Sequence, residues 1–363
     1  MAKFSEVLTI VNGRNQKQVV CDDGKYPIYG SGGIMGYAND YICKAETVVI
    51  GRKGSINKPI FVETPFWNVD TAFGLYANSE KLNPKYLYYF CEKFDFEKLN
   101  TTVTIPSLTK SNLLNVEIPL PNLEKQKQIV ELLDKVTSLI FLRKQQLAKL
   151  DELVKARFVE MFGNPKDNKK EWNRVPLKKV AEVRGRVGWK GYKKEDLQES
   201  GPLVLGATHL TENGNIDLSS PVYLSRDKYE ESPEIMLHRN DLVFTQRGNT
   251  IGKVGLVKED IGEATINPCV LILRPTNIHP IYLDVYFIMD EVKKDMWRLN
   301  AGSAQPMITQ KGISEYLLML PPIELQNQFA AFVERVDKQK KTVQQSLEKL
   351  ELMKKALMQE YFG

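Results

Sequence analysis

The chain has 363 residues, more than one ordinary hydrophobic core supports, so its length predicts two domains and connecting segments. Its 42% hydrophobic and 26% charged residues are typical of a globular protein, and no apolar run is long enough for a membrane span. A net charge of +5 is compatible with a nucleic-acid partner but does not by itself indicate one.

The cysteines and histidines are scattered along the chain and form no pattern typical of a metal site. They are Cys21, Cys43, Cys91, Cys269, His209, His238 and His279. We therefore expect no zinc centre, and the composition favours a protein of the reducing cytoplasm. The N-terminal residues MAKFSEVLTI have none of the features of a signal peptide.

Residues 1–120 are expected to form a β-rich block. The runs AETVVIG, KPIFVET and FGLYANS lie between turn residues and predict strands, and residues 83–94 predict a helix. The loop YGSGGIMGY at 29–37 fits no phosphate-binding pattern and is interpreted as a flexible turn. In IGRKGSIN, Arg52 ends a strand and is followed by Lys53 and Ser55, which suit contact with phosphate or guanine. The alternative is a hairpin turn with a surface arginine.

Residues 121–163 are expected to form one long helix. No glycine or proline occurs from 122 to 162, and Gly163 has the position of a C-terminal cap. Apolar residues recur in alternating steps of four and three, which predicts a narrow seam that packs on a partner helix. The seam consists of Ile129, Leu133, Val136, Ile140, Leu147, Leu150, Val154 and Met161, with Arg143 and Arg157 in two further seam positions.

Residues 164–320 are expected to form a second β-rich block. DLVFTQR, GKVGLV and PCVLILRP predict strands, and residues 279–296 predict a helix. The turn TQRGNTIGKVG places Arg247 among short polar residues, as in the first block. The segment RGRVGWKGYKK at 184–194 interleaves basic and aromatic residues, and either a phosphate contact or a solvated loop fits this pattern.

Residues 321–363 repeat residues 121–163, with 14 of 43 aligned positions identical and the same Phe-Gly ending. Fragments of the repeat extend upstream. VVIGRKGSI resembles VFTQRGNTI, and FSEVLTIVNGR resembles LKKVAEVRGR. The chain therefore contains two copies of one arrangement. Each copy is a block whose sequence differs between the copies, followed by a helix whose sequence is more similar.

The repeat predicts an α+β fold in which two β-rich globular domains are joined by two long antiparallel coiled-coil helices, as a pseudo-twofold repeat. The predicted bounds are 1–120, 121–163, 164–320 and 321–363. A helix of ~38 residues would be ~55 Å long. The second helix must run back towards the first block if the two helices pair over their full length, so the blocks are expected at opposite ends of the pair.

We find no catalytic signature. The sequences Asn164-Pro165-Lys166 and Asn267-Pro268-Cys269 fail the [NDS]PP[YF] pattern of amino-methyltransferases, and neither a Walker A motif nor HExxH occurs. A binding or targeting role is therefore favoured over an enzyme.

Two dissimilar β-rich modules, each ending in a repeated long helix, resemble the specificity subunit of type I restriction-modification systems. The resemblance is carried by PLPNLEKQKQIVELLDKV and LPPIELQNQFAAFVERV with their FG ends, by RGNTIGKVGLV and by WNRVPLKKVAEV. The first block lacks the Trp-x-x-Val lead-in and the GKVG sequence, so no residue role is carried over to it.

The resemblance implies that each block is a target recognition domain that reads one half of a bipartite, asymmetric site in double-stranded DNA. The helices would set the gap between the halves and dock two methylation (M) subunits, which supply the S-adenosylmethionine chemistry. Restriction (R) subunits would supply ATP- and Mg2+-dependent translocation and cleavage. This chain itself is expected to bind no cofactor and no metal.

The candidate DNA-binding residues come from the three loops described above. They are Arg52, Lys53, Ser55, Arg184, Arg186, Lys190, Gln246, Arg247, Asn249, Thr250 and Lys253. Two other functions remain open. The chain could be a stand-alone DNA-modifying enzyme with an unrecognised site, or a structural coiled-coil adaptor for other proteins.

Overall fold

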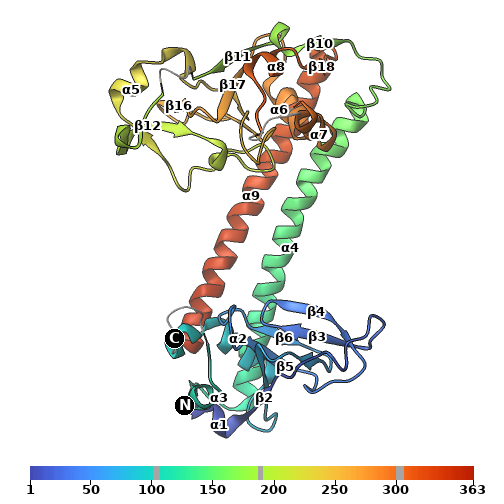
Figure 1. The fold of residues 1–363 in the computed structure, drawn as a ribbon, viewed down its shortest axis with the longest axis vertical. Helices are drawn as coiled ribbons and strands as arrows, with labels where there is room; N and C mark the ends of the chain where they lie inside the picture. Colours follow the sequence, from blue (N-terminus) through green and yellow to red (C-terminus); the bar gives the residue numbers. More distant parts are fainter. Residues whose placement is uncertain (101–106, 187–190, 300–305) are drawn as a thin grey trace. The chain divides into compact units, whose positions relative to one another are not determined.

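The computed structural model describes residues 1–100, 107–186, 191–299 and 306–363 (Figure 1). The chain forms two compact units. Unit 1 contains Met1–Lys144 together with Gln344–Gly363, and unit 2 contains Gln145–Val343. The two long helices are α4 (Leu123–Phe162) and α9 (Ile323–Phe362), with 40 residues each. Each long helix therefore begins in one unit and ends in the other.

Unit 1 is built on two small sheets. The first has the strand order β2-β8-β5-β6 with antiparallel neighbours, and the second has the order β4-β3-β7. The short strands β1 and β9 pair separately. The helices and strands are β1 (Ala2–Lys3), α1 (Phe4–Val7), β2 (Leu8–Asn12), β3 (Tyr26–Gly30), β4 (Gly33–Ala38), β5 (Thr47–Gly51), β6 (Ile60–Val62), β7 (Trp67–Asn68), β8 (Ala72–Ala77), α2 (Pro84–Lys93), α3 (Lys110–Leu114) and β9 (Glu117–Ile118).

Unit 2 repeats this arrangement. Its sheets have the orders β11-β17-β14-β15 and β13-β12-β16, and β10 pairs with β18. The helices and strands are β10 (Arg174–Pro176), β11 (Ala181–Gly185), β12 (Leu197–Leu205), β13 (Tyr223–Leu224), α5 (Arg226–Glu230), β14 (Leu242–Thr245), β15 (Val254–Leu256), β16 (Ala264–Ile266), β17 (Val270–Pro275), α6 (Pro280–Ile288), α7 (Asp290–Arg298), α8 (Gln310–Ser314) and β18 (Leu317–Met319). The helix predicted over 279–296 is thus two helices, which separate at Met289.

The two units use the same hydrogen bonds to attach the block to its helix. In unit 1 the backbone N–H of Asn83 donates to Oε1 of the buried Gln126, and in unit 2 that of His279 donates to Gln326, both at 2.8 Å. Each glutamine also donates from Nε2 to the carbonyl of the proline five residues before it, again at 2.8 Å. Duplication has therefore kept a buried polar joint, because an unpaired group there would be costly.

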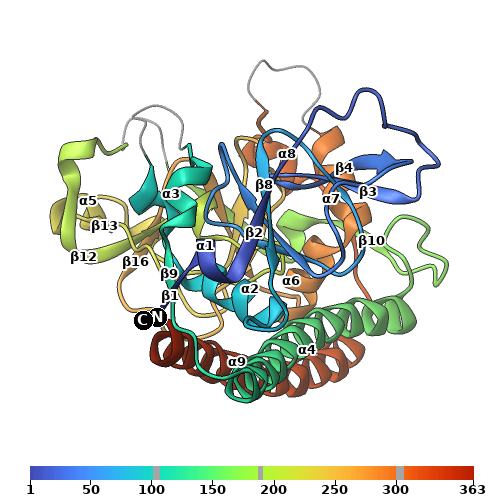
Figure 2. The same cartoon turned by 90° about the horizontal axis from the view of Figure 1, so that it is seen from below.

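The long helices run antiparallel in each unit (Figures 1 and 2). In unit 1, Lys144 on α4 pairs with Glu351 on α9 at 2.8 Å, while Phe362 lies in the core cluster that contains Leu133. In unit 2, Asp151 pairs with Lys340, and Phe158 contacts Phe329. Residue numbers rise along one helix as they fall along the other, so the predicted antiparallel pairing is confirmed.

The repeated Phe-Gly endings close the cores of the two units. Phe162 is fully buried in unit 2, with its ring centroid 4.9 Å from that of Tyr282. Phe362 lies equally far, 4.9 Å, from Tyr86 in unit 1. Tyr86 and Tyr282 are themselves equivalent, because each donates its hydroxyl to a backbone carbonyl just before the long helix, that of Pro119 or of Met319.

The buried face of α4 departs from the predicted seam near the end of the helix. Arg157 and Met161 are only partly buried, whereas Phe158 and Phe162 are fully buried. These last turns pack on a globular block as well as on the partner helix, so they follow the 3.6-residue period of an ordinary helix and not the 3.5-residue seam. Among the described helices, none combines the length and apolar character that a bilayer span would need.

Candidate DNA interface

The turn that follows β14 in unit 2 is fixed from both sides by backbone hydrogen bonds. The N–H groups of Gln246 and Arg247 donate to the carbonyl of Cys269 at 3.0 and 3.3 Å. The N–H of Ile308 in turn donates to the carbonyl of Gln246 at 2.9 Å. A rigid strand end therefore presents the side chains that follow it.

The tip of this turn is open. Gly248 has φ +100°, which favours glycine, and a Cβ built on it would meet nothing within 4 Å. Asn249 and Thr250, next along the chain, are exposed. Because no side chain covers the backbone at Gly248, another molecule can approach it closely. The side-chain amide of Asn249 can form hydrogen bonds with base edges.

The other predicted residues of this turn have partners within the protein. Arg247 donates from Nη2 to Sδ of Met307 at 3.2 Å, and Gln246 donates from Nε2 to the carbonyl of Pro268 at 3.0 Å. Lys253 pairs with Glu212 at 3.0 Å, and this hydrogen bond is the main reason that the pKa of Glu212 lies below its ordinary value. Lys253 therefore links the turn to Glu212, while the side chain of Arg247 remains half-exposed.

The corresponding turn of unit 1 follows β5. The N–H groups of Arg52 and Lys53 both donate to the carbonyl of Thr71, and Leu108 N–H donates to the carbonyl of Arg52 at 2.9 Å. Arg52 and Lys53 are exposed, and Ser55 is partly buried. The Arg52 guanidinium lies 5.8 Å from the ring centroid of Phe73.

These bonds correct the sequence alignment by one residue. Thr71 takes the place of Cys269, so Arg52 corresponds to Gln246 and Lys53 to Arg247. The bridges Lys53↔Ser107 and Arg247↔Met307 agree with this register, as do the positive φ angles of Gly54 and Gly248. The sequence alignment had instead equated Arg52 with Arg247. It was misled because both turns contain an arginine, one position apart.

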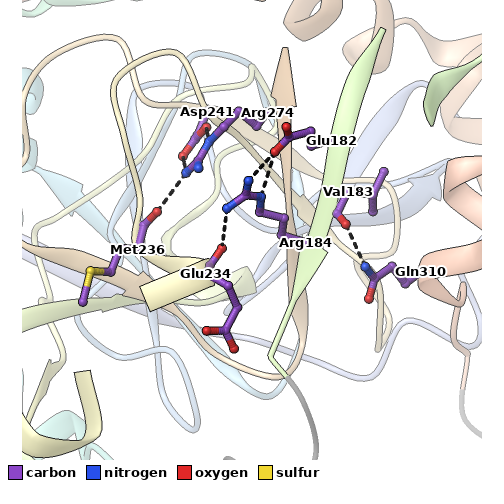
Figure 3. A network of polar contacts seen from close by, with 8 residues as sticks. All are labelled: Glu182, Val183, Arg184, Glu234, Met236, Asp241, Arg274 and Gln310. Carbon is purple, nitrogen blue, oxygen red and sulfur yellow. Dashed lines mark hydrogen bonds and ion pairs between the residues drawn. The ribbon is translucent and has the colours of Figure 1, made fainter. Parts of the chain in front are cut away.

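Arg184, the predicted residue on β11, is bonded to other residues of unit 2 (Figure 3). Arg184 pairs with Glu182 and donates from Nη1 to the carbonyl of Glu234 at 3.2 Å. The neighbouring Arg274 forms two bonds, of 2.7 and 2.8 Å, with the buried Asp241, which raises the pKa of Arg274. Gln310, also drawn in Figure 3, donates to the carbonyl of Val183 at 2.7 Å.

Arg186 is buried. It donates from Nε to the carbonyl of Ile266 at 3.0 Å and from Nη2 to Oγ1 of Thr265 at 3.1 Å, and its burial lowers its pKa. Its guanidinium also lies 5.3 Å from the ring centroid of Tyr192. These contacts give Arg186 a structural role. Lys190, the third predicted residue of this segment, lies outside the described residues.

Two features beside the turns were not predicted. In unit 1 the loop at 30–33 lies against the Arg52 turn, because a Cβ on Gly51 would be 3.1 Å from Cβ of Ser31. In unit 2, Lys293 and the exposed Trp297 line a cavity of about 140 Å³ together with Asn249 and Thr250. The sequence offered no signal for either contact, because both join segments that are far apart in the chain.

The described residues include no group of three or more side chains that could hold a metal ion. What the turns do offer is guanidinium, ammonium, amide and hydroxyl groups around open glycines, and these suit hydrogen bonds to phosphates and base edges. Fold and site together define a DNA-binding protein with a duplicated β-rich module.

Comparison with known proteins gives the family. The model of the type I restriction modification DNA specificity domain matches residues 1–152 and 169–352, and the chain belongs to this family. It is similar to the MjaVIII type I restriction enzyme specificity subunit of Methanocaldococcus jannaschii, with 26% identity over 338 residues that cover 86% of this chain and 75% of the relative. The chain is thus a type I restriction-modification specificity subunit.

Solved structures share the fold. The S subunit of the type I restriction-modification system of M. genitalium matches with a TM-score of 0.64 and 16% identity, covering 100% of this chain and 95% of that one. A chain from a study of complex assembly and conformational transition of the type I R-M system matches with a TM-score of 0.57 and 16% identity, covering 99% and 96%.

Proposed function

We propose that the chain reads a bipartite DNA site whose two half-sites differ in sequence, one for each unit. The observation that carries this proposal is the pair of equivalent turns. The same backbone bonds hold both turns, but Lys53 and Ser55 of unit 1 correspond to Arg247 and Asn249 of unit 2. Arginine and lysine differ in the groups they recognise, because only arginine offers a planar pair of donors to guanine.

The long helices dock two methylation subunits in this proposal. Apolar side chains that the helix pair does not bury support it, since Leu132, Leu139 and Leu153 recur at a spacing of seven or fourteen residues on α4 and are exposed. Leu142, three residues after Leu139, adds to this face of the helix. Exposed apolar side chains in such a row indicate a protein partner. The methylation subunits would bind S-adenosylmethionine, and restriction subunits would use ATP and Mg2+.

The chain acts as a targeting subunit without chemistry of its own. Incubation of the purified chain with DNA, S-adenosylmethionine and Mg2+ tests this, and we expect turnover only after partner subunits are added. Methyl transfer or cleavage by the chain alone would favour the rival function of a stand-alone enzyme. If the chain is instead only a coiled-coil adaptor, filter binding will show no DNA affinity that falls steeply with salt concentration.

Methylome sequencing of cells with and without this gene tests the split site directly. We expect an asymmetric motif of two parts in cells that carry the gene. Replacing the second block by that of another specificity subunit should change one part of the motif and leave the other part unchanged. A continuous motif, or a change in both parts, would contradict the proposal.

The helix lengths set the gap between the half-sites in this proposal. Insertion of one heptad into both α4 and α9 should lengthen the gap in the methylated motif. The same insertion in α4 alone would place the two seams out of register and should abolish methylation. A double insertion that leaves the gap unchanged would refute the role of the helices as a spacer.

A further inference from the structure

The tip of the β3–β4 hairpin in unit 1 carries two exposed apolar side chains, Ile34 and Met35, which we call the apolar tip. Ile34 is 56% exposed and Met35 is 64% exposed, although proteins usually bury these residue types. The strands pair from Tyr26 opposite Ala38 to Gly30 opposite Gly33, and lie side by side in Figures 1 and 2.

The hairpin is shaped so that Met35 projects from it. The register changes from Ile28↔Gly36 to Tyr29↔Ile34, so Met35 is an extra residue in a β-bulge. A bulge of this kind redirects a side chain. A Cβ on Gly30 would lie 2.5 Å from Sδ of Met35, so the glycine makes room for that side chain.

The apolar tip lies at the same end of unit 1 as the turn that carries Arg52 and Lys53. Ser31 at the tip lies against the turn, because a Cβ on Gly51 would be 3.1 Å from Cβ of Ser31, and one on Gly54 would be 3.9 Å from its Oγ. The segment after β7 joins the two features. Its Val69 N–H donates to the carbonyl of Tyr29 at 2.9 Å, and its Thr71 carbonyl accepts from Arg52 at 2.8 Å.

We propose that Ile34 and Met35 form a wedge that enters the DNA duplex between base pairs at the half-site read by unit 1. The inference rests on the proposed function. Apolar side chains that enter a duplex unstack a base step and bend the helix. The neighbouring Arg52 and Lys53 suit the phosphates on either side of such a step, which favours DNA over a protein as the partner.

The wedge has two consequences for recognition. Pyrimidine–purine steps unstack most easily, so the unit 1 half-site should contain such a step. Unit 2 should insert no equivalent wedge into its half-site, because its strand β12 pairs with the two-residue strand β13 and so does not repeat the β3–β4 hairpin.

The test uses the full chain, assembled with its methylation subunits, on a duplex that carries the methylated motif. 2-Aminopurine is placed at successive positions of the unit 1 half-site, where its fluorescence rises when the base unstacks. We expect a rise at one step with the native chain. The double variant Ile34→Ala/Met35→Ala should lose that rise and bind roughly tenfold more weakly, as apolar contacts are lost.

Val20→Ala is the matched control. Val20 is 53% exposed and lies opposite Ala38 at the other end of the same hairpin, so this variant should behave as the native chain. Unchanged fluorescence and affinity in the double variant would overturn the wedge while the proposed function stands. Loss of the methylation subunits with unchanged fluorescence would also overturn it, since the tip would then be a protein contact. Failure of the native complex to bind its motif would refute the proposed function itself.

Discussion

The C-terminal end of each long helix packs into the core of one unit, and the two ends differ in the residues at equivalent positions. In unit 2, Phe158 and Phe162 of α4 pack with Phe329 and Tyr282 in a cluster of four rings. In unit 1 the repeat places Met358 where Phe158 stands and Ile129 where Phe329 stands. The helix end therefore packs at the same position in both units, while the residues that fill this position differ. The aromatic contacts should make the end of α4 in unit 2 more rigid than the end of α9 in unit 1.

Removal of the aromatic ring that closes each core, that of Phe162 or of Phe362, should have the largest effect on stability. We expect Phe162→Ala to lower the free energy of unfolding of unit 2 by ~3–5 kcal/mol, as for other buried phenylalanines. Phe362→Ala should cost unit 1 less, because Phe362 is 9% exposed whereas Phe162 is fully buried. Hydrogen exchange read by mass spectrometry can follow each unit separately. Equal losses would contradict the comparison.

A buried carboxyl on α6 gives unit 2 a pH dependence of its own. Burial raises the pKa of Asp284 from its ordinary value of 3.8 to about 7. Asp337 adds to this rise, and Lys258 and Lys340 oppose it. Between these pH values the folded chain binds more protons than the unfolded chain, so stability should fall as pH rises from about 4 to about 7.

The variant Asp284→Asn should remove this slope and make unit 2 more stable by ~1–3 kcal/mol at pH 8. The equivalent position on α2 is Tyr88, so unit 1 should keep its own pH dependence in this variant. Urea denaturation monitored by hydrogen exchange from pH 4 to pH 8 provides the measurement. The same slope in the variant would show that other groups titrate in unit 2.

The two turns can be compared by single substitutions. We expect Arg247→Ala to weaken specific DNA binding by ~1–3 kcal/mol through loss of a bidentate contact to a base. Lys53→Ala, at the equivalent position, should weaken binding to specific and scrambled DNA alike and reduce the salt slope by about one. Competition binding at several salt concentrations distinguishes the two. Equal loss for Arg247→Ala on scrambled DNA would indicate a phosphate contact.

The smallest difference is expected between two ion pairs that link the helices. Lys144 and Glu351 of unit 1 are largely exposed, so Lys144→Ala should change stability by no more than ~0.5 kcal/mol. Lys340 of unit 2 is mostly buried beside Asp151 and Asp337, so Lys340→Ala should cost more, about 1 kcal/mol. Urea denaturation of both variants gives the comparison, and a larger cost at Lys144 would reverse it.

The sequence could predict the parts of the fold that depend on near neighbours in the chain. The long helices and their antiparallel pairing followed from the repeat, and so did the strands around Ile50 and Phe244. It could not predict that Phe158 would replace Arg157 on the buried face, because that burial depends on Tyr282, more than a hundred residues away. For the same reason, only the hydrogen bonds to Thr71 and Cys269 could show that Lys53 matches Arg247.

The distribution of the chain between its units has a consequence for biosynthesis. Unit 1 begins at Met1 but needs Gln344–Gly363, and Phe362 closes its core. Unit 1 is therefore completed by a segment that is translated only after the whole of unit 2. Unit 2 has all of its residues by Val343. At ~5–20 residues per second, the translation of some two hundred intervening residues takes ~10–40 s. During this interval the face of α4 that packs on α9 in unit 1 lacks that partner, and a chaperone could protect it.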